Sequence, residues 1–478
     1  MENQKTKIIS IASIIALALT LVTATFAYFM AQTGEGKSTD IKINASTVDT
    51  FTFEAGSALN LSLNQENFAS GKGNQAGTTF AKAMLTANNK TNTATEHYYL
   101  YLNISNNTFT YSIDNNTPEI LLSIKDSSNN EITTLTGLTY KTVTDGKGAS
   151  IKGFDITNKK GLVTILNNRE ITTTSTKTEE WNVTVTFVNY NSNQAGNAGK
   201  NFSAKLMIQK EEYKQTLVEY VKSQYTGTQG ENSLYYHDST LVNGAGDNSY
   251  RYAGASDSVN NYICLGSDAT TCPDANLFRI IGVFGDKTKV ISAKSIGSIV
   301  WDTNGSNTWS SSSLNTYLNG EYLTSLGTLA DKIATTKWKF VGGSWANIAS
   351  SVPKTAYQYE VGSYASTRTY AAKIGLMYVT DYYYSASPSA WTLVGYNESD
   401  ETKDYRAAKT TNWLFSGQEW TISRNSDDSD NAFLVINRGY VNINSVDFGY
   451  HVRPSFNLLS SAKYVSGSGS MSDPVRVN

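Results

Sequence analysis

Cys264 and Cys272 are the only two cysteines of this 478-residue chain, and eight positions separate them. In an oxidising compartment, two cysteines at so short a distance usually form a structural disulfide. The spacing is not C-x-x-C, which argues against a redox-active pair. Zinc binding is not favoured either, because none of the histidines His97, His237 and His451 stands next to a cysteine in the sequence. We therefore predict a disulfide between Cys264 and Cys272.

Two segments collect the hard oxygen ligands that calcium prefers, residues 302–307 and residues 427–431. Neither has the ligand spacing of an EF-hand or its closing Glu. Solvated turns are therefore the favoured interpretation of both segments, and calcium ligation is the alternative. We predict no other cofactor and no other metal.

Catalytic motifs are not found in the sequence. The chain contains neither G-x-S-x-G nor H-E-x-x-H, and three histidines leave little room for Ser-His-Asp chemistry. A pair of carboxylates for glycoside hydrolysis need not be close in sequence, and no pair stands out among the 41 acidic residues. We therefore predict no catalytic residues and favour a protein that is not an enzyme. An extracellular hydrolase acting on glycan or peptidoglycan is the alternative.

Aromatic side chains are the remaining chemical signal, and 30 of them are Tyr. Tyr382, Tyr383, Tyr384 and Trp391 lie in the densest stretch. On an extended strand neighbouring side chains point to opposite faces, so at least one of the three consecutive tyrosines should be exposed. Rings with a polar tip suit sugar stacking or a protein interface. These four residues are our predicted binding site for a glycan or protein ligand, and a role in the core is the alternative.

The N-terminus predicts export. Lys5 and Lys7 precede an uncharged apolar run over residues 8–30, which is the order of a secretory signal. The small residues Thr25 and Ala27 stand at the −3 and −1 positions of a cut before Tyr28. We therefore expect cleavage between Ala27 and Tyr28 and a protein that is secreted or at the cell surface. The run is also long enough to cross a bilayer, so a transmembrane anchor is the alternative.

A net charge of −2 without a basic cluster argues against nucleic-acid binding.

Periodicity divides the rest of the chain. From residue 41 to 209 apolar residues alternate with polar ones, most clearly at Trp181, Val183, Val185 and Phe187. Many short alternating strands separated by turn residues predict a β-sandwich or jelly roll over residues 28–210. Helical spacing follows and predicts a helical linker over 211–230. Residues 231–478 show both patterns and predict an α+β domain, with one hairpin around Gly285-Asp286, a second joined at residues 437–439, and a helix capped by the serine run 310–313. The chain as a whole should be mainly β.

The step Thr25-Phe26-Ala27-Tyr28-Phe29 resembles the junction that SipW-type signal peptidases cut in the TasA and camelysin family. The β-rich segment behind it is similar in layout to the TasA-like jelly roll. The resemblance covers about residues 8–210 and implies a fibre-forming biofilm-matrix protein whose partner during export is such a peptidase. After cleavage, residues 28–45 would be a free end with Ile41 and Ile43 alternating, so we expect this segment to add as a strand to a neighbouring copy. The alternative is that residues 41–45 pair inside their own sandwich and leave a monomer.

The second half resembles a domain of unknown function in surface proteins of Gram-positive gut bacteria. The matching blocks are residues 277–282, 309–319, 419–424 and 449–456. Its last strands are also similar to those of C-type-lectin-like folds. Together the two halves predict a surface or matrix protein that acts in assembly and adhesion. A hydrolase and a diversified ligand-binding display protein are the alternatives.

Overall fold

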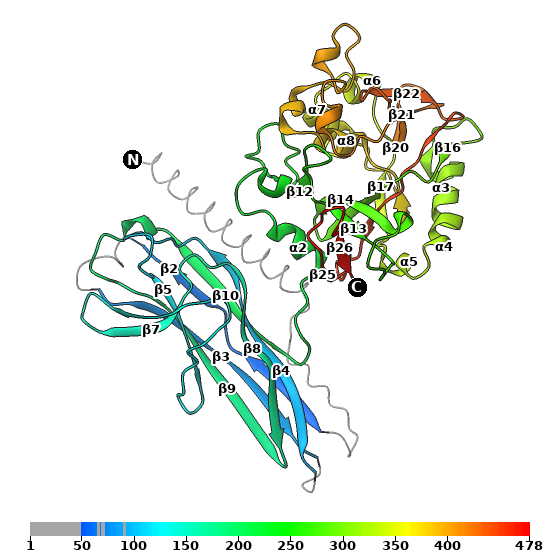
Figure 1. Cartoon of the computed structure of the whole chain (residues 1–478). Helices are drawn as coiled ribbons and strands as arrows, with labels where there is room; N and C mark the ends of the chain where they lie inside the picture. Colours follow the sequence, from blue (N-terminus) through cyan, green and yellow to red (C-terminus); the bar gives the residue numbers. More distant parts are fainter. Residues whose placement is uncertain (1–48, 65–66, 68–71, 89–91) are drawn as a thin grey trace, which may run out of the picture. The chain divides into compact units, whose positions relative to one another are not determined.

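The computed structural model describes residues 49–64, 67, 72–88 and 92–478. It is mainly β, as expected, and the chain divides into two compact units, Met1–Tyr213 and Lys214–Asn478 (Figure 1). Each unit has its own hydrophobic core. The two units are therefore described separately.

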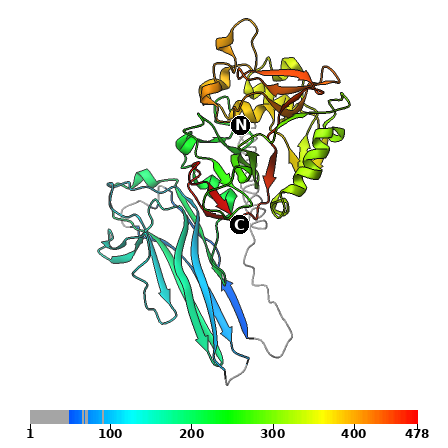
Figure 2. The same ribbon diagram turned by 45° about the vertical axis from the view of Figure 1, so that its right-hand side comes forward.

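The first unit contains two antiparallel sheets whose long strands lie side by side in Figure 1 and Figure 2. The six-stranded sheet has the order β1 (Thr50–Ala55), β3 (Gln75–Thr86), β9 (Thr176–Phe187), β5 (Ile120–Asp126), β7 (Ser150–Asp155) and β6 (Tyr140–Thr144). The four-stranded sheet has the order β2 (Leu59–Ser62), β10 (Asn201–Gln209), β4 (Ala94–Asn107) and β8 (Gly161–Thr173).

Alternation explains why these strands form a sandwich. In β9 the side chains of Trp181, Val183, Val185 and Phe187 are buried, while the residues between them are partly exposed. Inward side chains of both sheets, among them Leu100 of β4, join one core. Each sheet thus covers the apolar face of the other, and the predicted β-sandwich is confirmed.

The second unit mixes strands and helices around a nine-stranded sheet. Its main path is β19 (Ile374–Gly375), β24 (Ser455–Leu458), β15 (Lys287–Ser292), β14 (Leu277–Phe284), β13 (Tyr262–Cys264), β26 (Val475–Val477) and β25 (Tyr464–Ser466), with β12 (Ser249–Tyr252) and β11 (Leu234–His237) attached through β14. A five-stranded sheet has the order β16 (Ser298–Val300), β23 (Gly449–His451), β20 (Glu419–Arg424), β21 (Asn431–Val435) and β22 (Val441–Ser445), and β17 (Thr336–Lys339) pairs with β18 (Thr369–Ala372).

The helices of this unit are short. They are α2 (Leu217–Ser223), α3 (Ser313–Tyr317), α4 (Leu323–Ser325), α5 (Leu329–Lys332), α6 (Trp345–Ile348), α7 (Pro353–Glu360) and α8 (Val379–Tyr384). The helix expected in the linker is α2, which starts at a capping box between Thr216 and Glu219. Its residues Leu217 and Val221 enter the core, so α2 is part of the second unit rather than a spacer.

Local signals located several elements correctly. The hairpin expected around Gly285 is the β14–β15 pair, and β21 pairs with β22 in the second predicted hairpin. Ser312 caps α3, as the serine run predicts, because its hydroxyl accepts the backbone N–H of Asn315. The predicted strand through Tyr382–Tyr384 is wrong, because these residues form the second half of α8.

Candidate functional site

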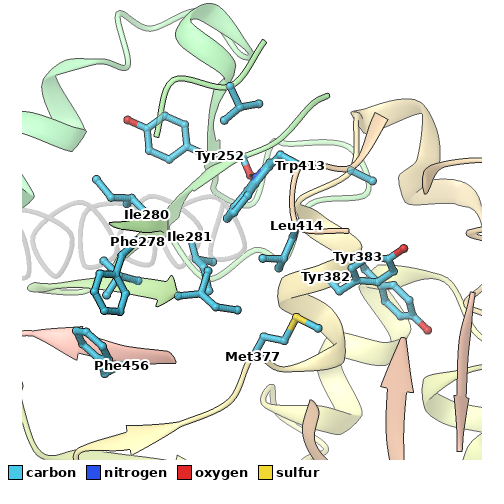
Figure 3. Close-up of a cluster of buried hydrophobic side chains, with 14 of the residues drawn as sticks. Tyr252, Phe278, Ile280, Ile281, Met377, Tyr382, Tyr383, Trp413, Leu414 and Phe456 are labelled. Carbon is cyan, nitrogen blue, oxygen red and sulfur yellow. Dashed lines mark hydrogen bonds between the residues drawn. The ribbon is translucent and has the colours of Figure 1, made fainter. Parts of the chain in front are cut away.

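The predicted aromatic binding site is part of the core. Tyr382 and Tyr383 have no exposed surface, and Tyr384 and Trp391 are 1 % exposed. Figure 3 places Tyr382 and Tyr383 in the same buried cluster as the other labelled side chains. The expectation that at least one of the tyrosines reaches the surface was wrong because it assumed an extended strand. As placed, none of the four can contact a ligand.

The carboxylates of Asp381 and Glu360 accept the first backbone N–H groups of helix α8. Asp381 accepts the backbone N–H of Tyr378 at 2.8 Å, and Glu360 of α7 accepts those of Val379 and Thr380, each at 2.8 Å. These are the donors that a helix start leaves without an internal partner. Satisfying them in the core stabilises α8 although its sequence, rich in Tyr, has only a modest helix propensity.

The polar tips of the four aromatic residues all bond to backbone carbonyls. Tyr382 donates to Gly439 at 2.7 Å and Tyr383 to Ile348 at 2.8 Å. Tyr384 donates to Asn243 at 3.3 Å and the Trp391 indole to Ala386 at 3.0 Å. Buried hydroxyls need such partners. The tips predicted to face a ligand instead bond to the backbone of neighbouring loops and, at Ile348, to the end of α6.

The histidines do not assemble a catalytic group. His237 is fully buried beside Tyr384 and Trp391, with ring centroids 4.9 and 5.1 Å away. Its Nδ1 accepts the backbone N–H of Ala245 at 3.1 Å, and burial holds the pKa of this histidine well below its usual range. His451 is exposed on β23. Among the described residues, no three His, Cys, Asp or Glu side chains gather as a metal site would require.

The two segments considered for calcium meet in space. The side-chain amide of Asn307 donates to the carbonyls of Asn425, Asp428 and Asn431 at 3.0, 3.1 and 2.9 Å. The carboxylate of Asp302 accepts the N–H groups of three residues of its own region, Asn304, Ser306 and Ser313. These oxygens serve a hydrogen-bonded junction between two turns. Sequence reasoning missed Asn307 as the residue that joins the turns, since 118 residues separate it from Asn425.

The predicted disulfide is present. Cys264 ends β13 and Cys272 lies in the loop before β14, with their sulfur atoms 2.05 Å apart and their Cα atoms 5.8 Å apart. The proposed cleavage point, Ala27 and Tyr28, lies outside the described residues, as does the expected donor strand over residues 28–45. In the part of the chain that the structure describes, no helix is long and apolar enough to cross a membrane.

Buried charged side chains form a cluster around Asp381 of α8. Lys289, Asp381 and Arg251 are each less than 5 % exposed, and we call them, with Asp247, the ionic cluster. Lys289 Nζ is 2.5 Å from Asp381 Oδ2, and Arg251 Nη1 is 3.9 Å from Asp381 Oδ1. Arg251 Nη2 also contacts Asp247 Oδ2 at 2.7 Å. Burial alone would raise the pKa of Asp247, but the positive charge of Arg251 outweighs this effect and holds that pKa well below its usual range.

Aromatic faces surround these charges. Lys289 Nζ lies 4.3 Å from the ring centroid of Tyr378 and 5.2 Å from that of Trp338. The Arg251 guanidinium lies 4.7 Å from the ring centroid of Phe284. Burial lowers the pKa of Lys289, because its ammonium has lost water that Asp381 replaces only in part. The cluster is therefore dry and tightly held.

The first unit carries an open groove of about 400 Å³. Tyr101 of β4, Thr164 and Ile165 of β8, residues 134–136 of the β5–β6 connection, and residues 212–213 line it. Ile165 and Leu135 are members of the sandwich core. The groove therefore reaches the core between the two sheets. Its lining comes from four separated segments, so no local sequence signal could reveal it.

The groove is lined by both polar and apolar side chains. The Tyr101 hydroxyl accepts the backbone N–H of Tyr213 at 3.0 Å, and their ring centroids are 5.9 Å apart. Glu212 is the one carboxylate among the lining residues. Within the described residues β8 is an edge strand that pairs only with β4, and four of its residues line the groove. A strand edge with a groove beside it suits an added strand.

Comparisons of the chain with protein-family models, with curated proteins and with solved structures found no match.

Proposed function

We propose that this chain is an exported surface or matrix protein that acts in assembly and adhesion, and that its first unit provides the assembly contact. The observation that carries the proposal is the groove beside edge strand β8, which reaches the sandwich core at Leu135 and Ile165. Export is supported by Lys5 and Lys7 before the apolar run and by the disulfide of the second unit.

In this proposal a neighbouring copy donates residues 28–45 after cleavage at Ala27. Its backbone pairs with the open edge of β8, and its alternating Ile41 and Ile43 enter the groove. Backbone pairing provides affinity and the side chains in the groove provide specificity. Repetition of this head-to-tail contact between identical copies gives a fibre when the rotation from one copy to the next does not close a ring. The second unit is then displayed along the fibre.

The alternatives have less support. A glycoside hydrolase needs two facing carboxylates, and this alternative would place them in the second unit. In the groove of the first unit, Glu212 is the one acid that lines it. Burial of Tyr382, Tyr383, Tyr384 and Trp391 rules out ligand binding through these rings for an adhesion protein and for a display protein alike, so support for the first choice comes from the first unit. The assembly contact therefore remains our first choice.

The test uses the exported protein and two perturbations of the contact. Thr164→Arg places a long charged side chain in the groove at an exposed position, and deletion of residues 28–37 shortens the donor segment. Thr178→Arg, at an exposed position on β9 of the other sheet, is the matched control. We expect fibres in negative stain from the unchanged protein and from the control, and folded monomers from the other two.

Circular dichroism confirms that each variant is folded before assembly is scored. Fibres from both Thr164→Arg and the deletion would overturn the donated-strand contact. An unchanged protein that stays monomeric at high concentration would overturn assembly itself. N-terminal sequencing of the extracellular protein checks export, and a start at Tyr28 is expected, as for cleavage by a SipW-type peptidase. A start at Met1 would mean that the segment stays as an anchor.

A further inference from the structure

Lys289 and Asp381 form an ion pair that is buried on both sides. Lys289 lies on β15, Asp381 lies in the first turn of α8, and the two side chains are 5 % and 3 % exposed. Their Nζ and Oδ2 atoms are 2.5 Å apart, in direct contact. The amine is therefore positioned against the carboxyl group of a residue 92 positions away.

The surroundings of the amine disfavour its charged form. The rings of Tyr378 and Trp338 face the amine, and burial lowers the pKa of Lys289. In a dry site, transfer of the proton from the ammonium to the carboxylate removes two charges whose burial is costly. The products of that transfer are a neutral amine, which is a nucleophile, and a carboxylic acid, which it can attack.

We propose that Lys289 and Asp381 join in an intramolecular isopeptide bond. Lys289 Nζ attacks Cγ of the protonated Asp381 carboxyl group and forms a tetrahedral intermediate. The Cγ–Oδ2 bond then breaks, and the oxygen leaves as water. Of the three hydrogens of the original ammonium, two leave with this water and one stays on the amide nitrogen. The reaction balances without an oxidant, a reductant or another co-reactant.

Neighbouring groups suit this reaction. Arg251 Nη1 lies 3.9 Å from Asp381 Oδ1, the oxygen that remains, so its charge stabilises the oxyanion of the intermediate. The backbone N–H of Tyr378 donates to Oδ2 at 2.8 Å and holds the leaving oxygen in place. Glu360 acts as a positioning residue, because it accepts the N–H groups of Val379 and Thr380 and so fixes the turn that carries Asp381.

A buried salt bridge is the competing interpretation, and mass distinguishes the two. The experiment is tryptic peptide mapping of the full chain after reduction and denaturation. We expect no cleavage after Lys289 and one branched peptide that joins the Lys289 and Asp381 segments, lighter by one water than the sum of its parts. Complete cleavage after Lys289, with both peptides linear, would overturn the proposal whatever the variants do.

Variants identify the bond. Lys289→Arg and Asp381→Ala should each remove the branched peptide, and they are scored by peptide mass, so the readout does not require a stable fold. Lys294→Arg is the matched control: Lys294 also contacts a carboxylate, that of Asp274, but both residues are exposed. The branched peptide should persist in this control. A branched peptide that survives Lys289→Arg would place the bond elsewhere and overturn the assignment.

Discussion

Acidification should destabilise the second unit through His237. This side chain has no exposed surface and its pKa is held well below the usual range by burial, so it stays neutral in the folded state. In the unfolded chain it titrates with an ordinary pKa of about 6.5. Below that pH the unfolded state binds a proton that the folded state does not, and the free energy of unfolding therefore falls as the pH falls.

The magnitude follows from this one proton. Relative to neutral pH, the loss for a histidine that stays neutral in the fold is about 1.4 kcal/mol at pH 5.5 and about 2 kcal/mol at pH 5. Other groups contribute pH dependence of their own, since burial raises the pKa of Glu360. The quantity to compare is therefore the difference between the unchanged protein and His237→Leu at each pH, in which shared contributions cancel.

Urea unfolding followed by tryptophan fluorescence is a suitable assay. Trp181 is in the first unit and the other seven of the eight tryptophans are in the second, so the signal reports chiefly the unit that contains His237. The advantage of the unchanged protein over His237→Leu should shrink by about 2 kcal/mol between pH 7.5 and pH 5. His451→Gln, at an exposed position, should run parallel to the unchanged protein. Parallel curves for His237→Leu would refute a neutral buried histidine.

Two further changes test the core of the same unit. Replacing Cys264 and Cys272 by Ser should cost about 2.5 kcal/mol, because the denatured chain loses its short closed loop. A reductant should lower the stability of the unchanged protein equally and leave this variant unaffected; a further shift in the variant would contradict the assignment. Tyr383→Phe should cost about 1–2 kcal/mol, because the carbonyl of Ile348 loses its partner. Tyr364→Phe, at a position 69 % exposed, should cost nothing, and equal melting temperatures for the two variants would argue against a structural role for the Tyr383 hydroxyl.

Features that depend on residues close together in the chain could be predicted from the sequence. Features that depend on contacts between distant segments could not. The alternation of β9, the β14–β15 hairpin and the Cys264–Cys272 bridge all depend on residues close together in the chain. The conformation of Tyr382–Tyr384 does not. These residues are helical because Glu360, from a different helix, accepts the first N–H groups of α8. The groove depends in the same way on a β5–β6 connection that lies against β8.

The anchoring of loops by buried aromatic residues bears on how this protein can change over evolution. Tyr382, Tyr383 and Tyr384 hold Gly439, Ile348 and Asn243 through backbone carbonyls, which every residue type supplies. The anchor therefore does not depend on which side chain the loop carries. At Asn243, where φ is +59°, residues that accept a left-handed backbone are favoured. Elsewhere in the two loops that carry Gly439 and Asn243, outward-facing side chains can be exchanged while Tyr382 and Tyr384 keep the loop backbone in place.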